Sequence, residues 1–242
     1  MSEVLTNPYR FASAVSPTLE FDFTDDTGWQ FNNAYSWITE TGGGTLNIKC
    51  SKDGVKEAAV YPFSLDSITL ETKWVLRAYD MNWTNGLPNY GQALLGFTDL
   101  GKTESEAQNH WGVAGLFFAG SEGGQYGAYL NLEGWTDAAQ YEPNEVKIVY
   151  PCSAPCTPFQ DNDPLWVELA MNEGTLTSKV FDNDDFDSTP VATNTNSTYT
   201  AEQSTNTTYL SLKNFAVDLG EVGFQMQLSI GGLKFWNGVS EV

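Results

Sequence analysis

The stretch LWVELAMNEGTLTSKVFD, from Leu165 to Asp182, decides the fold because apolar and polar residues alternate along it. This two-residue period is that of strands with one buried face. The first set of alternating residues is Val167, Leu169, Met171, Leu176 and Val180. The opposite set is Trp166, Glu168, Ala170, Thr175, Thr177 and Lys179. Asn172-Glu173-Gly174 separates the two halves, and Gly174 is free to take a positive φ, so the stretch predicts a β-hairpin.

Similar strand-like runs recur along the 242-residue chain, separated by Gly, Asn and Asp, and long amphipathic helical stretches are absent. With 41% hydrophobic and 14% aromatic residues, the chain has enough apolar material for a core. These features predict an all-β, antiparallel sandwich or barrel. Besides the hairpin, strands are expected at Leu19–Phe23, Thr45–Cys50, Ala58–Tyr61, Ile68–Ala78, Gln92–Thr98, Trp111–Ala119, Tyr126–Leu132, Glu145–Tyr150, Tyr209–Leu212, Val222–Ile230 and Leu233–Trp236.

Three stretches resemble the concanavalin A-like lectin/glucanase superfamily, including its laminin-G-like members. The hairpin is similar to a family strand that begins at Trp166 and returns to end at Phe181-Asp182. The run from Gly220 to Gly238 looks like the closing strands, and Phe21-Asp22-Phe23 followed by Gly28-Trp29 looks like the opening strand. The resemblance implies an antiparallel jelly-roll β-sandwich whose last strand lies beside its first. It implies no particular activity.

The chain is expected to consist of an N-terminal arm, residues 1–18, and a single sandwich domain, residues 19–242. The arm is polar and contains Pro8 and Pro17, and such arms are usually disordered alone. Either the sandwich itself or other subunits of an assembly would therefore have to hold it. Both alternatives stay open at this point.

A formal net charge of −20 limits the partners that this protein can have. Such a surface repels phosphate backbones and anionic membranes, so we expect neither nucleic-acid binding nor membrane insertion. No run approaches the roughly 20 apolar residues of a membrane helix. The first residues also lack the basic and apolar regions of a secretory signal. A merely soluble acidic surface is the simplest interpretation of the charge.

Two of the three cysteines, Cys152 and Cys156, lie in the Pro-rich stretch PCSAPCTP, where a local disulfide is one expectation. Cys50 alternates with Leu46 and Ile48 and would then be a buried free thiol. Metal binding by the cysteine pair is disfavoured, because no second pair exists and His110 is the single histidine.

No catalytic residues are predicted. Glycoside hydrolases of this fold resemble one another in a Glu-x-Asp-x-(x)-Glu strand motif, whose carboxylates face each other across a sugar bond. The nearest stretch here, Glu20 to Asp25, lacks the final Glu and lies in the opening strand. His110 has no nucleophile motif nearby. We therefore expect a protein that is not an enzyme.

Calcium is the one cofactor that the sequence suggests. Asp182, Asp184, Asp185 and Asp187 lie close together after the hairpin, and a hard cation prefers such oxygen ligands. The EF-hand spacing is absent, so a solvated acidic loop is the alternative interpretation.

Aromatic and amide residues in expected loops are candidates for carbohydrate binding, because rings stack on sugars and amides bond hydroxyls. The candidates are Asn82, Trp83, Tyr90, Asn109, Trp111 and Trp135. Core packing is the alternative role for each tryptophan. Glycosylation sequons begin at Asn82, Asn196 and Asn206.

Together these features predict a non-enzymatic surface module of an extracellular particle, such as a structural or appendage protein of a virion, with an adhesive, glycan-binding role. A virion component leaves the cell by assembly and release, which reconciles lectin-like features with the missing signal. The alternatives are a secreted or cell-surface lectin, and a polysaccharide hydrolase or lyase.

Overall fold

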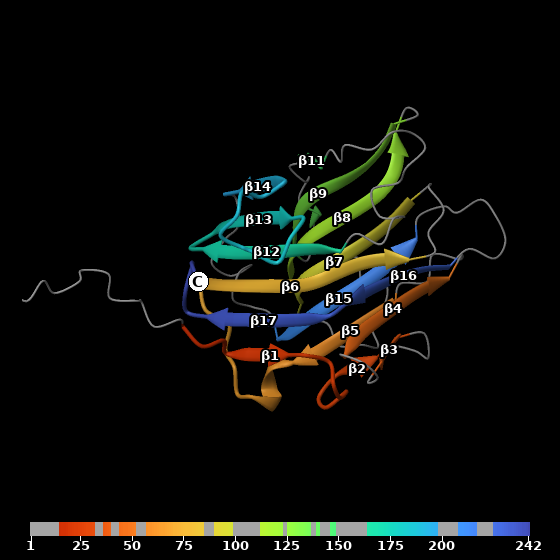
Figure 1. The fold of residues 1–242 in the computed structure, drawn as a ribbon. Helices are drawn as coiled ribbons and strands as arrows, with labels where there is room; N and C mark the ends of the chain where they lie inside the picture. The colour runs from red at the N-terminus through yellow and green to blue at the C-terminus, as the bar shows by residue number, and fades with distance from the viewer. Residues whose placement is uncertain are drawn as a thin grey trace, which may run out of the picture.

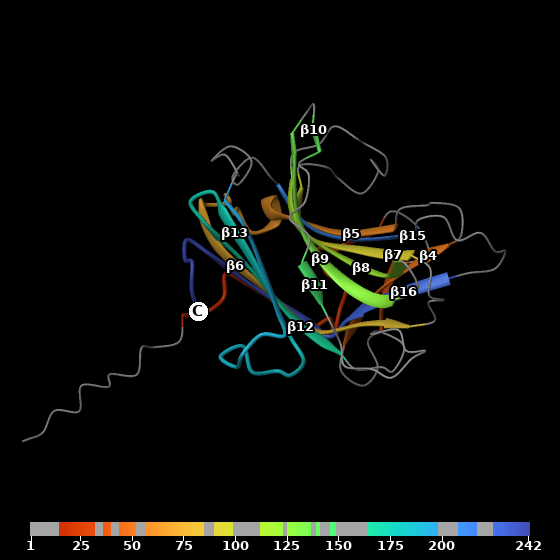
Figure 2. The same cartoon turned by 90° about the horizontal axis from the view of Figure 1, so that it is seen from above.

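The computed structural model describes residues 15–31, 36–39, 44–51, 57–84, 90–98, 112–122, 125–136, 139–140, 146–148, 164–197, 208–216 and 225–242. In these ranges two antiparallel sheets face each other and form a sandwich (Figure 1). Seen from above, the second sheet curves away from the first (Figure 2). The expectation of an all-β antiparallel sandwich is therefore confirmed.

The first sheet has nine strands in the order β14-β13-β12-β6-β16-β4-β3, with β17 pairing with β6 and β1 with β17. Its strands are β1 (Leu19–Phe21), β3 (Ser36–Thr39), β4 (Thr45–Ser51), β6 (Lys73–Thr84), β12 (Leu165–Asn172), β13 (Thr175–Phe181), β14 (Ala192–Asn196), β16 (Gln225–Ile230) and β17 (Gly232–Asn237). The pairing of β1 with β17, Leu19 opposite Phe235, confirms that the last strand lies beside the first.

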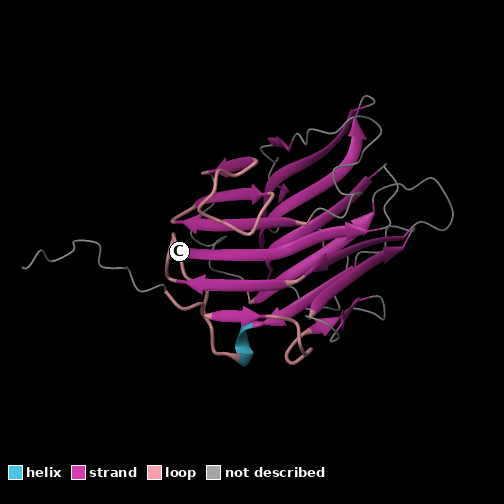
Figure 3. Ribbon diagram, in the orientation of Figure 1, coloured by secondary structure: helices cyan, strands magenta, loops and turns pink. Residues whose placement is uncertain are grey.

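The second sheet has eight strands in the order β10-β9-β8-β7-β15-β5-β2, with β11 pairing with β9. Its strands are β2 (Gln30–Phe31), β5 (Glu57–Pro62), β7 (Tyr90–Thr98), β8 (Gly112–Glu122), β9 (Gln125–Thr136), β10 (Ala139–Gln140), β11 (Val146–Ile148) and β15 (Tyr209–Ala216). A single 3-10 turn, Phe63–Leu65, is the one helical element of the described residues, as the secondary-structure view shows (Figure 3). No helix in the described ranges has the length and hydropathy of a membrane span.

The predicted hairpin is present as β12 and β13, paired from Trp166 opposite Phe181 to Asn172 opposite Thr175. The turn therefore contains two residues, Glu173 with φ 49° and Gly174 with φ 94°. Positive φ at both central positions is typical of a type I′ turn, whose twist matches that of the paired strands. This turn fixes the register, and with it the face on which each side chain lies.

The strand predicted at Ile68–Ala78 is shifted in the structure, where β6 spans Lys73–Thr84. Residues 68–72 lie outside the ladder, in irregular chain with a bend at Thr72, although Leu70 is buried. The prediction of a loop from Tyr79 onward is wrong for residues 79–84, which belong to β6. The cause is a bulge: Asp80 has φ 56°, and the register with β12 shifts between Leu165 and Val167. The extra residue lets the ladder continue beyond Tyr79.

Aromatic rings join the two sheets in the core. Trp74 of β6 makes an edge-on contact with Phe97 of β7, with ring centroids 4.6 Å apart. Phe235 of β17 lies 5.3 Å from Phe97 and is stacked on Phe63 at 5.6 Å. All four side chains are at most 2% exposed. These contacts position each sheet against the other and make the sandwich a rigid platform.

The last residues of the predicted arm, residues 15–18, lie along β17. The indole nitrogen of Trp236 donates to the Val15 carbonyl at 2.8 Å, and the Thr18 amide donates to Phe235 at 2.6 Å. The Asn237 amide donates to the Thr18 hydroxyl at 3.0 Å. The sandwich itself thus holds this part of the arm, while residues 1–14 lie outside the described ranges.

Tyr61 gives the stability of the fold a measurable pH dependence. Its hydroxyl donates to the Asp66 carboxylate at 2.6 Å, and burial, with this hydrogen bond, raises the pKa of Tyr61 to about 12. In the unfolded chain the pKa is about 10. The folded state therefore retains the proton more strongly, so this contribution is complete below pH 10 and is lost as the pH rises to about 12.

We expect the unfolding free energy of the wild type, measured by urea titration, to fall more steeply between pH 10 and 12 than that of Tyr61→Phe. The phenylalanine variant keeps the ring packing and serves as the matched control, because other tyrosines and lysines titrate equally in both proteins. Parallel stability curves across this window would contradict the prediction.

Candidate functional site

A row of charged side chains crosses the outer face of the first sheet, one residue from each of five adjacent strands. The strand registers place the following residues in line: Glu20, Lys234, Arg77, Glu168 and Lys179. Glu20 binds Lys234 at 2.8 Å, and this hydrogen bond raises the pKa of Lys234 above its usual value. Burial raises the pKa of Tyr79 beside the row, although the positive charges of Lys234 and Arg77 oppose that shift. Along the row, each carboxylate lies beside at least one cation.

Glu168 is the centre of this row and is only 6% exposed. One carboxylate oxygen accepts from Arg77 through Nη2 at 2.7 Å and Nε at 2.8 Å, and the other accepts from Lys179 at 2.9 Å. A buried carboxylate without partners would cost several kcal/mol, so both cations are needed here. The pairs leave Glu168 with its charge neutralised and both oxygens bonded.

Arg77 also holds the C-terminal segment and the loop after β13 against the sheet. Its guanidinium donates to the main-chain oxygen of Val242 at 2.8 Å. The same group lies 4.5 Å from the ring centre of Phe186 and 5.5 Å from that of Trp236. Cation–π contacts of this kind favour a planar guanidinium. One side chain therefore joins β6, β12, the 182–190 loop and the C-terminal segment.

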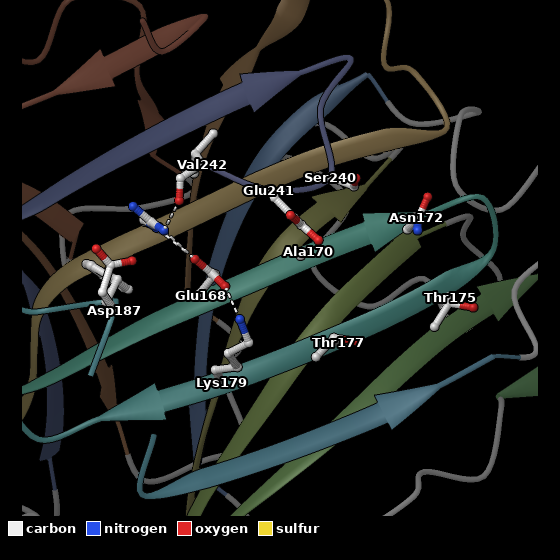
Figure 4. A pocket seen from close by; sticks show the side chains of 12 residues that line it. Glu168, Ala170, Asn172, Thr175, Thr177, Lys179, Asp187, Ser240, Glu241 and Val242 are labelled. Carbon is white, nitrogen blue, oxygen red and sulfur yellow. Dashed lines mark hydrogen bonds and ion pairs between the residues drawn. The ribbon is translucent and has the colours of Figure 1, made fainter. Parts of the chain in front are cut away.

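A pocket of about 400 Å³ lies between these two segments on the outer face of β12 and β13 (Figure 4). Asn172, Thr175 and Thr177 line it from the hairpin, and Glu241 reaches over β12 from the C-terminal segment. Ala170, between Glu168 and Asn172 on the same face, leaves room at its base. No local pattern in the sequence predicts this pocket.

The four aspartates of the predicted calcium loop, at positions 182, 184, 185 and 187, all lie in the turn region after β13 and are exposed. Several of their polar groups are used to shape the loop: Asp185 accepts from the Asp187 amide at 2.9 Å, and Asn183 accepts from the Asp185 amide at 2.9 Å. Within the described ranges, no three acidic, His or Cys side chains are arranged to hold a metal ion. In this arrangement the four carboxylates do not fit a Ca²⁺ ion, which takes six to eight oxygen ligands.

The predicted carbohydrate-binding residues divide between two ends of the sandwich. Asn82 and Trp83 lie near the end of β6, at the right of Figure 1, and Tyr90 begins β7 after a short connection. Trp135 lies on β9 rather than in the predicted loop, because β9 extends to Thr136. Tyr90 pairs with Gly120 of β8, whereas Trp135 pairs with Gly112. Eight residues of strand separate those two glycines, which is roughly 27 Å.

The remaining predicted residues are placed less completely. Asn82 lies within a paired segment opposite Ser229, and its side-chain oxygen is buried without a hydrogen-bond partner, so its sequon differs from the exposed loop that was expected. Asn196 ends the edge strand β14. Five predicted site residues lie outside the described ranges: Asn109, Trp111, Cys152, Cys156 and Asn206.

Arg77 and Glu168 are the residues that sequence reasoning missed. The hairpin register alone would have paired Glu168 with Lys179, because Asn172 opposite Thr175 fixes every later pair. The place of Arg77 depends on the pairing of β6 with β12, which brings together segments 91 residues apart. No local pattern in the sequence carries that information.

No family model matches the sequence, and no curated protein matches it. Solved structures do match. The carbohydrate recognition domain of Emp47p is 11% identical, with a TM-score of 0.58 over 88% of this chain and 90% of that chain. The exoplasmic/lumenal domain of VIP36, bound to Ca²⁺ and Man3GlcNAc, is 12% identical, with a TM-score of 0.55 over 90% and 87%.

The CBM2 module of the evolved Dit of Lactobacillus casei BL23 phage J-1 is 9% identical, with a TM-score of 0.54 over 94% of this chain and 98% of that chain. These likenesses extend over nearly the whole of each chain, and the two sheets and the β1–β17 pairing agree with them. The chain therefore has the concanavalin A-like lectin fold, a jelly-roll β-sandwich.

Proposed function

We propose that this protein is a non-enzymatic, glycan-binding surface module of an extracellular particle, and that the particle is a virion. The observation that carries the proposal is the likeness in fold to lectin domains and to a phage module, which covers 94% of this chain and 98% of the phage module. The fold supplies a rigid platform, and the candidate residues Asn82, Trp83, Tyr90 and Trp135 lie at or near strand ends.

A binding role is supported by the state of the carboxylates in the opening strand, where the glucanase-like motif was considered. Glu20 is engaged with Lys234 at 2.8 Å. Asp22 accepts from the Thr24 hydroxyl at 2.7 Å and the Thr24 amide at 3.1 Å, which lowers the pKa of Asp22. An acid that protonates a leaving group needs a raised pKa. Asp22 therefore lacks the environment of a glycosidase acid, and Glu20 is occupied by its ion pair with Lys234.

Adhesion to a glycan would use the two ends of the sandwich, the first with Asn82, Trp83 and Tyr90, the second with Trp135 in β9. The first end lies between the last residue of β6 and the first residue of β7. Because these strands belong to different sheets, the chain crosses from one sheet to the other at this end. The N-terminal arm, which enters beside β17, would join the module to other subunits. Because the arm contacts Trp236, which lies opposite Val75 near the start of β6, the first end at Trp83 would stay free while the arm is engaged.

Glycan binding is tested by a glycan array with three single variants. We expect Trp83→Ala or Trp135→Ala to lower the affinity for the strongest ligand about fivefold, because an aromatic contact contributes about 1 kcal/mol. Trp166→Ala is the matched control, since Trp166 lies opposite Phe181 in the hairpin and is not one of the candidate carbohydrate-binding residues. If the wild type binds no glycan on the array, the proposal of glycan binding is contradicted. If the two test variants bind as tightly as Trp166→Ala, then Trp83 and Trp135 do not contact the glycan.

The particle assignment is tested separately by fractionating the native source. We expect the protein to sediment with intact particles and to be released only when they are dissociated. Removing residues 1–14 should leave the sandwich folded, because the described contacts of the arm begin at Val15, and should abolish incorporation. Recovery of the full chain solely as a free monomer would overturn the particle role without affecting the glycan proposal.

Calcium binding remains a proposal, supported by the Ca²⁺-bound VIP36 domain of similar fold. Because the loop carboxylates do not converge, an ion would have to reorganise the 182–190 loop. An ion that binds only the folded state raises its stability by mass action. We therefore expect Ca²⁺ to raise the melting temperature measured by calorimetry.

Asp184→Asn should remove that thermal shift while preserving the hydrogen bonds of Asn183 and Asp185 within the loop. Glu173→Gln, in the hairpin turn, is the control for general charge effects, since its carboxylate lies on a different loop. The absence of both heat and thermal shift in the wild type would exclude Ca²⁺ as a cofactor.

A further inference from the structure

The pocket on the outer face of β12 and β13 has the features of a ligand site separate from the two ends of the sandwich. Its volume of about 400 Å³ falls in the usual range for small-molecule sites. It exists because β12 carries the small Ala170 at its base, while Glu241 and Asp187 rise on opposite sides from the C-terminal segment and the 182–190 loop (Figure 4). The walls therefore come from segments that Arg77 holds in place.

Three carboxylates, those of Glu168, Asp187 and Glu241, and two cations, Arg77 and Lys179, line the pocket, so its acidic side chains outnumber the basic ones. Both cations bind Glu168. The charged groups that remain, Asp187 and Glu241, are exposed carboxylates. They would repel an anion, as would the net charge of −20. A divalent ion is also disfavoured, since no group of three metal-ligating side chains exists in the described ranges.

The polar lining suits a ligand rich in hydroxyl groups. Carboxylates accept hydrogen bonds from hydroxyls, whereas the Thr175 hydroxyl and the Asn172 amide can donate as well as accept. The Thr177 hydroxyl is 3.3 Å from that of Thr195, and this bond uses one of the three hydrogen-bonding positions of the hydroxyl. Phe186 adds an aromatic surface at the wall.

We propose that this pocket binds a neutral saccharide of one or two sugar units. The site is independent of Trp83, Tyr90 and Trp135, so it holds whether or not the ends of the sandwich bind glycans. Its floor is part of the first sheet and its walls are fixed by Arg77, so little ordering is needed when the ligand binds. A module with this pocket and an occupied end would contact a polysaccharide at two separate places.

The experiment is an NMR titration of the full-length, isotopically labelled protein with mannose, maltose and lactose, and with glucuronate and inorganic phosphate as anionic probes. We expect at least one neutral sugar to shift the amide signals of Ala170, Asn172, Thr175 and Thr177 in a saturable manner, with a dissociation constant in the millimolar range. The anionic probes should leave these signals unchanged.

Ala170→Gln, which places a larger side chain at the base of the pocket, should raise the dissociation constant of the sugar at least tenfold. Thr193→Gln is the matched control, because Thr193 lies opposite Lys179 on β14 and is exposed without lining the pocket. If Ala170→Gln does not fold, Thr177→Val is the second test. It keeps the shape of the side chain but removes its hydroxyl, so it should raise the dissociation constant of the sugar severalfold.

Three results would overturn the proposal: unchanged pocket signals with every neutral sugar, undiminished binding in both pocket variants, or a preference for phosphate or glucuronate. Trp83→Ala and Trp135→Ala should leave the pocket shifts intact. A negative result for sugar binding in the pocket is therefore distinguishable from a negative result for glycan binding at the ends of the sandwich.

Discussion

The alternation of apolar and charged rows across the first sheet is the constraint on which the rest of the structure depends. The inner row next to the charged one consists of Leu19, Phe235, Leu76 and Leu169, and all four are buried. The neighbouring outer row carries Arg77 and Glu168, paired with each other across β6 and β12. Because side chains alternate along a strand, a slip of one residue would bring this ion pair into the core and expose the apolar row. Register is therefore specified from both faces at once.

This constraint also decides where the sandwich can vary. The inner faces are filled by rings that contact each other between the sheets, such as Trp74 and Phe97, so substitutions there disturb packing. The outer face of the first sheet is fixed at Glu168, whose carboxylate needs both of its cations. Freedom remains at the strand ends and in segments that rest on the outer face, including the 182–190 loop. The candidate binding residues lie in those places.

The sequence was sufficient for the features that repeat locally. Two-residue alternation and Gly174 predicted the hairpin, and the same reasoning located most strands to within a few residues. It failed at β6, where a bulge at Asp80 interrupts the period and a non-glycine residue takes a positive φ. It could not assemble the outer row or the pocket, because these depend on pairing between β6 and β12. The calcium prediction counted carboxylates close in sequence, whereas the loop directs Asp185 and Asn183 toward its own backbone amides.

Charge and hydrogen-bonding chemistry favour the same class of ligand. A net charge of −20 repels anions, but at physiological ionic strength the field is screened within about 8 Å, so it acts mainly on ligands already near the surface. Discrimination at contact must then come from the groups that are left without ionic partners. On the outer face Arg77 and Lys179 both bind Glu168, and the other polar groups of the pocket are hydroxyls, an amide and the carboxylates of Asp187 and Glu241. Such a surface favours binding of a ligand that donates many hydrogen bonds and carries no negative charge. A neutral sugar has both properties.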